Sequence, residues 1–446
     1  MDQFEIVADQ LSEDRLVGLL CDLVNIPSAT GNEQAIGEYL LRHFRSLGIE
    51  AQAQELEEGR LNAVGILRGT GGGPTLMFNG HMDTSLTGLD EHDRAVLGDV
   101  HEAFRPRAFV EEGYVRGLGA YNMKGALAAY LGAIEAIVRS GVALKGDVVV
   151  AGVAGEIEKT PVETVTKDYA GKLYRGAGCG TRYLPIHGVW ADYAIVGEPS
   201  DLHINTAHPG YCWFKVTVRG HFTRTTAIAR GVNAIKKMTK VIDTIDAWGK
   251  TYTARKAAEW RRRVGDDPYS VVKPNVNVGA IEGGWPYKPT WSTAICNLYL
   301  DVRQLPGDSP LDIQAELQGV LDGLKAQDPD LNVSAHMYMS NPGGQLVDRG
   351  SYIVDAAARA VERVLGTRPA RVPDELGSYW CDMNILNRMG IAAITLGASD
   401  ESVAKWDGKG EYFSIRQLVQ GTQVYVATIL DVCNQDRATL RGNRYA

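Results

Sequence analysis

The amino-acid sequence predicts an α/β fold: a mostly parallel, doubly wound sheet with an inserted ferredoxin-like α+β lid domain. Two observations predict the sheet. Residues 146–153 form a nearly continuous apolar run, which is typical of a strand buried on both faces. Residues 123–138 place leucine, isoleucine and valine at helical spacing, and strand-like and helix-like segments alternate along the chain. A third observation, the βαββαβ order of the middle third, predicts the lid.

The outer segments supply the elements of the larger domain. Helices are expected at 16–24 and 36–44, where apolar residues recur on one face. Short apolar runs separated by turns predict strands at 61–67, 75–78 and 192–196. The segment 156–190 is irregular and rich in glycine and tyrosine, so we expect a long loop there. The C-terminal part resumes the pattern with a helix, a strand and a helix at 352–365, 392–396 and 415–433.

The pattern changes near residue 208. Strands are expected at 211–218, 276–281, 294–302 and 331–339, and helices at 231–248 and 311–324. The sequence therefore predicts a larger domain made of residues 1–207 and 341–446, and an inserted lid domain made of residues 208–340.

Composition excludes several classes of function. The 446 residues carry a formal net charge of −8 without a block of lysine or arginine, so neither nucleic acid nor an anionic membrane surface is an expected partner. No apolar run approaches the roughly 20 residues of a membrane span, and the acidic, polar start resembles no signal peptide. Six widely spaced cysteines without a CxxC pair indicate reduced thiols, and we expect a cytoplasmic protein.

Four polar motifs follow predicted strands or open a helix. His81 and Asp83 form a His-x-Asp motif at the end of the strand at 75–78, where open sheets bind ligands. Asn122 lies in a glycine-rich turn, where an ordinary N-cap is the simpler interpretation. Glu156 and Glu198 each follow or end an apolar strand, and such acids are more often solvated than catalytic.

Taken together, the motifs resemble those of one family. The order His81-Met82-Asp83, the glycine-rich turn, Glu156 and Gly197-Glu198-Pro199-Ser200 is similar to that in the co-catalytic zinc aminoacylase, acetylornithine deacetylase, succinyl-diaminopimelate desuccinylase and glutamate carboxypeptidase superfamily. The likeness covers nearly the whole chain, including 231–235 in the lid and 390–397 near the end. It implies a zinc-exopeptidase-like catalytic, metal-binding domain at 1–207 and 341–446 and a lid and dimerisation domain at 208–340.

The resemblance implies a role for each residue. His81 and Glu198 would bind a first metal ion, Zn²⁺ or Mn²⁺, and Asp83 would orient the imidazole. Glu156 would be the general base that accepts a proton from water activated by the metal. The family also dimerises through its lid, so a homodimer or larger homo-oligomer is expected by resemblance.

The sequence departs from the family at the second metal. Asn122 stands where the family has an Asp that bridges two ions, and Ile157 stands where it has a second acidic ligand. No His occurs in 399–410, where the family has its last ligand. One metal ion per chain, held by His81, Asn122 and Glu198, is the resulting prediction, with Glu158 or Asp407 as the residues that could complete the site. In the lid, Arg224 replaces a His that crosses to the partner subunit, which favours binding of an anion.

The predicted function is metal-dependent hydrolysis of a C–N bond in a small carboxylate-bearing substrate. One alternative is an aminohydrolase that releases ammonia from an aromatic amine acid of the nitroanthranilate type, and an aromatic pocket of Tyr121, Tyr379 and Trp406 would suit it. Another is a non-enzymatic binding protein that has lost the metal. Among the remaining histidines, His208 at the domain junction is the first to consider as a site residue.

Overall fold

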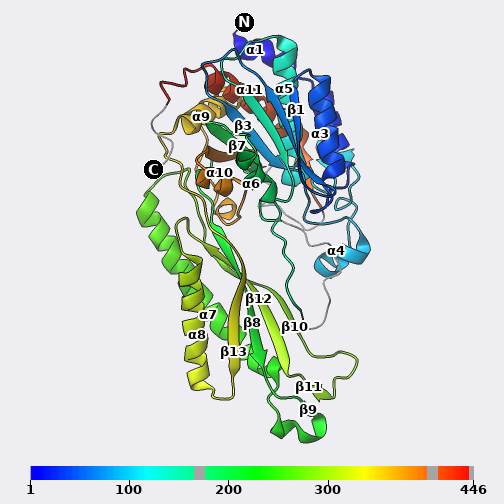
Figure 1. The fold of residues 1–446 in the computed structure, drawn as a ribbon, viewed down its shortest axis with the longest axis vertical. Helices are drawn as coiled ribbons and strands as arrows, with labels where there is room; N and C mark the ends of the chain where they lie inside the picture. Colours follow the sequence, from blue (N-terminus) through cyan, green and yellow to red (C-terminus); the bar gives the residue numbers. More distant parts are fainter. Residues whose placement is uncertain (1, 165–175, 399–409, 441–446) are drawn as a thin grey trace.

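A computed structural model describes residues 2–164, 176–398 and 410–440. It shows a larger α/β domain and an elongated lid that extends away from it (Figure 1). The larger domain is built from both ends of the chain, and the lid from its middle third.

The larger domain contains a six-stranded mixed sheet. The strand order is β1 (Glu50–Glu57), β2 (Arg60–Leu67), β6 (Val148–Val153), β3 (Leu76–His81), β7 (Tyr193–Pro199) and β14 (Ala392–Gly397). Four neighbouring strands, β6, β3, β7 and β14, run parallel to one another. Strand β2 pairs antiparallel with β6, and β1 pairs antiparallel with β2. The predicted fold class, a mostly parallel α/β sheet, is confirmed.

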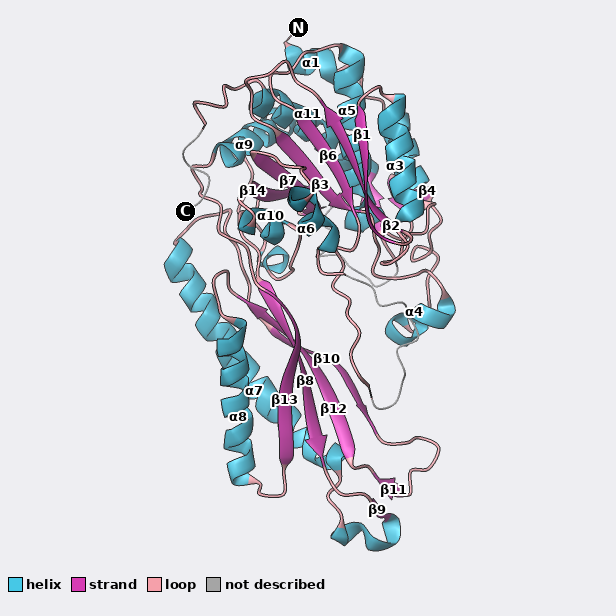
Figure 2. Cartoon of the chain, viewed as in Figure 1, coloured by secondary structure: helices cyan, strands magenta, loops and turns pink. Residues whose placement is uncertain are grey.

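Helices cover both faces of this sheet (Figure 2). On one face pack α2 (Glu13–Val24), α3 (Gln34–Ser46), α5 (Gly125–Ser140), α9 (Tyr352–Leu365) and α11 (Ile415–Cys433). On the other face pack the short helices α6 (Cys179–Ile186) and α10 (Met383–Arg388). The continuous apolar pattern of β6 and the complete burial of β3 follow from this coverage of both faces.

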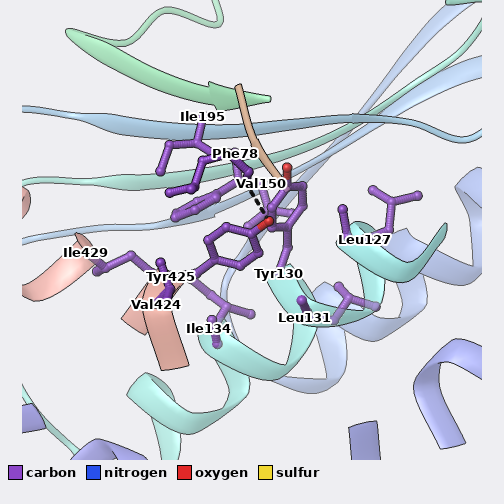
Figure 3. Packing of buried hydrophobic residues seen from close by; sticks show 14 of the residues in the cluster. Phe78, Leu127, Tyr130, Leu131, Ile134, Val150, Ile195, Val424, Tyr425 and Ile429 are labelled. Carbon is purple, nitrogen blue, oxygen red and sulfur yellow. Dashed lines mark hydrogen bonds between the residues drawn. The ribbon is translucent and has the colours of Figure 1, made fainter. Parts of the chain in front are cut away.

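Aromatic rings fill the centre of the larger core (Figure 3). Phe78 from β3, Tyr130 from α5 and Tyr425 from α11 lie with ring centroids 5.0 to 5.3 Å apart. Their edge-on and tilted contacts are the arrangements that aromatic quadrupoles prefer. The tyrosine hydroxyls donate to the carbonyl groups of Asn79 and Leu396, so the burial leaves neither hydroxyl unpaired.

The lid is a four-stranded antiparallel sheet with two helices on one face. Its elements follow the predicted βαββαβ order: β8 (Gly210–Arg219), α7 (Ala234–Val264), β10 (Val276–Gly283), β12 (Ile295–Gln304), α8 (Pro310–Gln327) and β13 (Asn332–Asn341). The sheet order is β10-β12-β8-β13. A two-stranded ribbon of β9 (Thr223–Arg224) and β11 (Trp291–Ser292) lies at the end of the lid farthest from the larger domain (Figure 1).

The structure corrects several sequence predictions. Helix α7 ends at Val264 rather than near 248, because its outer face stays polar while buried residues continue at helical spacing to Trp260. Part of the segment 156–190 is not a loop, since α6 lies within it. Short elements without a clear apolar period were missed: α1 (Gln3–Ala8), α4 (Asp90–Leu97) and the small sheet of β4 (Phe109–Glu111), β5 (Tyr114–Arg116) and β15 (Tyr412–Ser414). None of the described helices combines the length and the apolar character that a bilayer crossing requires.

Candidate metal centre and active site

Three of the predicted residues meet at one edge of the main sheet. His81 ends β3, Glu156 follows β6 by three residues, and Glu198 is the second-last residue of β7. These strands are parallel neighbours, so their carboxyl ends lie at the same edge. One ligand atom from each residue falls within 4.8 Å of the others, and all three side chains are buried.

The hydrogen bonds of His81 fix which of its nitrogens faces this cluster. Nδ1 lies 2.8 Å from the carbonyl oxygen of Asp83, so Nδ1 carries the proton and donates it. Nε2 lies 2.7 Å from Oδ1 of Asn122, and because an amide oxygen only accepts, this contact needs either a proton on Nε2 or a cation between the two atoms. Carboxylate oxygens of Glu198 and Glu156 lie 3.6 and 4.0 Å from the same nitrogen. Acceptor atoms therefore converge from several sides.

The donor set fits a divalent cation. Glu198 Oε1 is fully buried and makes no hydrogen bond to any residue of the described ranges. A bound cation would supply the missing partner of this oxygen. A ring nitrogen with amide and carboxylate oxygens suits Zn²⁺ or Mn²⁺. The residues that would hold the ion are His81, Asn122 and Glu198, with Glu156 beside them.

Electrostatics in the cluster also favour a cation. Burial, reinforced by neighbouring carboxylates, raises the pKa of Glu156 well above its ordinary value. The same causes raise the pKa of Glu198 to about 7, although His81 opposes the shift. Burial lowers the pKa of His81, but Glu198 and Asp83 outweigh it, so that the pKa rises. Ionising several neighbouring carboxyl groups is unfavourable because the negative charges repel, and a bound cation would offset this repulsion.

Asp83 has a different geometry from the one implied by the family resemblance. Its backbone carbonyl, rather than its carboxylate, receives the hydrogen bond from His81, and the carboxylate lies 3.6 Å from Nδ1. The carboxylate instead accepts the backbone N–H groups of Glu156 and Ile157 at 3.0 and 3.2 Å, and the Thr30 hydroxyl at 2.9 Å. Asp83 thus positions both the imidazole and the backbone of Glu156.

Asn122 is held by a buried acid that the sequence prediction missed. Glu411 accepts the backbone N–H groups of Gly119 and Asn122 at 3.0 and 3.3 Å. Burial raises the pKa of Glu411 to about 7, and the nearby Lys124 opposes this. The Glu411 carboxylate therefore holds the backbone of the turn at 120–124 that carries Asn122.

Asp382 is a second buried acid that the prediction missed. It accepts a hydrogen bond of 2.7 Å from the Thr181 hydroxyl, and its Oδ1 is buried without a partner in the described structure. Burial raises the pKa of Asp382 to about 6. An acid placed between Cys381 and Met383 in an apolar stretch was the signal that could have identified it.

A cavity of about 490 Å³ opens beside the cluster. Its described lining consists of Ser85, Tyr121, Asn122, Glu156, Ile157, Glu158, Lys159, Glu198, Pro199, Glu375, Leu376, Ser378, Tyr379 and Trp380. Of the predicted aromatic pocket, Tyr121 and Tyr379 line it, whereas Trp406 lies outside the described residues. Trp380, which the prediction missed, contributes a buried Nε1–H without a partner in the described ranges.

Glu158 forms an ion pair with the lid instead of joining the metal-binding cluster. Both of its oxygens pair with Arg303 from lid strand β12, at 2.9 and 3.2 Å. Glu158 therefore lines the cavity as half of an interdomain ion pair and does not belong to the cluster around His81. The other suggested ligand, Asp407, lies outside the described residues.

Arg224 and His208 lie away from the cluster. Arg224 is exposed on β9, in the ribbon at the far end of the lid (Figure 1), so one chain does not bring it to its own cavity. His208 is buried: its ring nitrogens lie 3.2 Å from the Tyr379 carbonyl and 3.0 Å from the Thr395 hydroxyl. Burial lowers its pKa to about 3, which makes it a neutral core residue.

Comparison with known proteins identifies the family. Residues 77–431 match the model of peptidase family M20/M25/M40, and the chain belongs to this family. It is therefore a metal-dependent hydrolase of C–N bonds, as the sequence resemblance predicted.

Individual relatives are distant. The chain is 25% identical over 430 residues to the N-formyl-4-amino-5-aminomethyl-2-methylpyrimidine deformylase of Bacillus subtilis, covering 91% of each chain. It is 27% identical over 309 residues to the acetylornithine deacetylase of Aliivibrio fischeri, covering 67% of this chain and 68% of the relative. Among solved structures, human carnosine dipeptidase 1 has a TM-score of 0.73 at 15% identity, covering 98% and 100% of the two chains. A Staphylococcus aureus tripeptidase has a TM-score of 0.68 at 20% identity, covering 96% and 100%. These two likenesses concern the fold.

Proposed function

We propose that the chain hydrolyses a C–N bond (amide, N-acyl or amine) of a small carboxylate-bearing substrate, using one Zn²⁺ or Mn²⁺ ion per chain. His81, Asn122 and Glu198 would hold the ion, and Glu156 would act as the general base. The observation that carries the proposal is the convergence of buried acceptor atoms on His81 Nε2 at the inner end of the cavity. A divalent cation supplies two effects there: it polarises the substrate carbonyl and lowers the pKa of water from ~16 towards ~7.

The position of Glu156 suits proton transfer. Its backbone N–H is held by the Asp83 carboxylate, and its Oε2 faces the imidazole at 4.0 Å. During hydrolysis, water adds to the carbonyl carbon and its proton passes to Glu156. The same proton then passes to the leaving nitrogen as the C–N bond breaks. One carboxylate can serve both steps if its pKa lies near the working pH.

Two cationic groups are available for a substrate carboxylate. Lys159 lines the cavity, and burial lowers its pKa although nearby acids oppose the shift. Arg224 could act only from a second subunit, because it lies at the far end of its own lid. A homodimer formed through the lid, with Arg224 reaching the partner's cavity, is therefore part of the proposal.

The aromatic lining supports a second candidate function. Tyr121, Tyr379 and Trp380 border the same cavity and could bind a flat ring. The aminohydrolase that releases ammonia from an aromatic amine acid would use the same base and metal ligands. The products distinguish the two reactions, since hydrolysis of an N-acyl amino acid yields a carboxylic acid and an amino acid, whereas the aminohydrolase yields ammonia. The non-enzymatic alternative is disfavoured by family membership and by the assembled cluster.

The test combines metal analysis with turnover. We expect about one Zn²⁺ or Mn²⁺ per chain, lost in His81→Ala, and hydrolysis of N-acyl amino acids or release of ammonia from aminobenzoates. Glu156→Gln should lower kcat by about 10²- to 10⁴-fold while keeping the metal. Glu375→Gln, in the same cavity but outside the cluster, is the matched control and should lower it little. Full activity of Glu156→Gln, or a wild-type protein that binds no metal, would refute the proposal.

A further inference from the structure

The lid carries a second cavity on the face of its sheet that α7 and α8 leave uncovered. The cavity measures about 400 Å³, and Trp213, Tyr299 and Tyr338 border it together with Ala280 and Val162. Its surroundings are therefore mainly aromatic and aliphatic. Such a hollow in a hydrolase is suited to an apolar group of a ligand.

Strand β12 connects this lid cavity with the catalytic cavity. Alternate residues of a strand share a face, so Tyr299, Asp301 and Arg303 follow one another on the helix-free side. Arg303 binds Glu158 in the catalytic lining, and its Nε donates to Asp301 in the lid lining at 2.8 Å. Four residue steps from 299 to 303 correspond to roughly 13 Å. The two cavities are thus a short distance apart along one strand.

A row of aromatic rings in mutual contact connects the lining of the catalytic cavity with that of the lid cavity. Trp380 of the catalytic lining lies 5.8 Å from Tyr211, which lies 5.3 Å from Trp213 of the lid lining. Trp213 lies 6.0 Å from Tyr338, and Tyr338 lies 6.4 Å from Tyr299. All of these centroid distances fall in the range of direct aromatic contact.

The segment that begins at Glu156 also borders both cavities. Glu156 to Lys159 line the catalytic cavity, and Val162 lines the lid cavity. The Lys215 ammonium group donates a hydrogen bond of 2.6 Å to the carbonyl of Glu163, which attaches this segment to the lid sheet. The segment that carries the proposed base Glu156 therefore continues directly into the lining of the lid cavity.

We propose that the lid cavity is a subsite for an apolar or aromatic substituent of the substrate, reached along β12, where Tyr299 of the lid lining lies roughly 13 Å from Arg303, the partner of Glu158 in the catalytic lining. The inference rests on the proposed hydrolase function, since the scissile bond is placed at His81. The spacer between the two ends would be uncharged, because Arg303 on the path already pairs with Glu158 and Asp301. The natural substrate would thus be an amide with a long apolar or aryl extension rather than a minimal N-acetyl amino acid.

The test measures binding without turnover. Acetohydroxamate, 3-phenylpropanohydroxamate and 6-phenylhexanohydroxamate bind metals through the same head group and differ in the reach of their apolar end. Isothermal titration calorimetry on the full chain loaded with one equivalent of Zn²⁺ would give each Kd. We expect the Kd of the longest compound to be at least tenfold lower than that of the phenylpropano compound.

Two lid variants test the location of the effect. Ala280→Trp fills the lid cavity and Tyr338→Ala removes one of its rings, and both should abolish the tenfold gain while changing acetohydroxamate binding less than twofold. Leu311→Trp, exposed on α8 on the other side of the lid, is the control and should keep the gain.

Each outcome has a separate meaning. If acetohydroxamate binds but tether length has no effect, or if the lid variants keep the gain, the subsite is refuted while the metal site stands. If no hydroxamate binds, the proposed function fails and the subsite with it. If Ala280→Trp changes the sedimentation coefficient instead of hydroxamate affinity, the cavity is a contact between copies of the chain, and the subsite is refuted.

Discussion

The ion pair between Glu158 and Arg303 joins the wall of the catalytic cavity to the lid, and its removal should weaken the folded state. Arg303 also pairs with Asp301 at 2.8 Å and lies over the Tyr211 ring at 5.4 Å. Arg303→Met keeps the apolar stem over that ring but leaves two carboxylates without their cation. Glu158→Gln removes one charge and leaves Arg303 paired with Asp301.

The magnitude follows from distance and burial. Two unit charges 4 Å apart attract by about 4 kcal/mol at an effective dielectric constant of 20. The side chains of Arg303 and Glu158 are 13% and 22% exposed, so solvent screens the pair only in part. Because a lost partner leaves an uncompensated buried charge, Arg303→Met should cost about 3 kcal/mol and Glu158→Gln about 1–2 kcal/mol. The double variant should cost about 2 kcal/mol less than the sum of the single variants.

Urea unfolding at pH 8, followed by tryptophan fluorescence and circular dichroism, measures these differences where the two signals coincide. The pair Arg255–Glu316 on the lid surface is a matched control: one guanidinium nitrogen donates to both carboxylate oxygens, but the side chains are 47% and 36% exposed. Its coupling should stay below about 1 kcal/mol. The reasoning is refuted if Arg303→Met and Glu158→Gln are additive within about 0.5 kcal/mol.

Further predictions concern Asp83, Glu411 and His208. Asp83→Asn turns an amide NH₂ towards backbone N–H groups, so kcat should fall by roughly 10- to 100-fold at unchanged metal content, measured by steady-state kinetics and elemental analysis. Glu411→Ala leaves the N–H of Asn122 unpaired and should weaken metal affinity at least tenfold in a chelator titration, whereas Glu411→Gln should weaken it less. The pKa of His208 is about 3 when folded and about 6.5 when unfolded, so below pH 6.5 the unfolded chain takes up a proton that the folded chain does not. Stability should therefore fall between pH 7.5 and pH 5 by about 2 kcal/mol more in wild type than in His208→Gln, and parallel pH profiles in urea unfolding would contradict this.

Strand ends explain why much of the metal cluster could be predicted from sequence. His81, Glu156 and Glu198 each lie at or just beyond the end of an apolar run, and the carboxyl ends of neighbouring parallel strands share one edge. Neither the neighbour order of β6, β3 and β7 nor the imidazole tautomer is visible in the sequence. Both depend on tertiary pairing, and for the same reason the sequence does not show that Asp83 orients the imidazole through its backbone carbonyl.

Residues whose position depends on how the lid meets the larger domain could not be predicted. Glu158 is two residues from Glu156, and only the approach of β12 shows that Arg303 binds it. Arg224 lies on a short ribbon whose distance from the cavity follows from the length of the lid. Trp380 follows a stretch without regular periodicity, so its place in the cavity lining beside the predicted Tyr379 depends on the path of a loop.

The substitution of Asn122 is consistent with the charges around it. An aspartate at this position would add a third carboxylate within reach of His81 Nε2, beside Glu156 and Glu198, and a single divalent ion would not balance all three. With asparagine, the two remaining carboxylates match the charge of one divalent ion, and Oδ1 still offers a ligand atom. Arg303 meanwhile neutralises Glu158, the next acid along the wall. The two carboxylates nearest to His81 Nε2 therefore match the charge of the single ion that we propose, as the missing second-site ligands of the sequence also indicate.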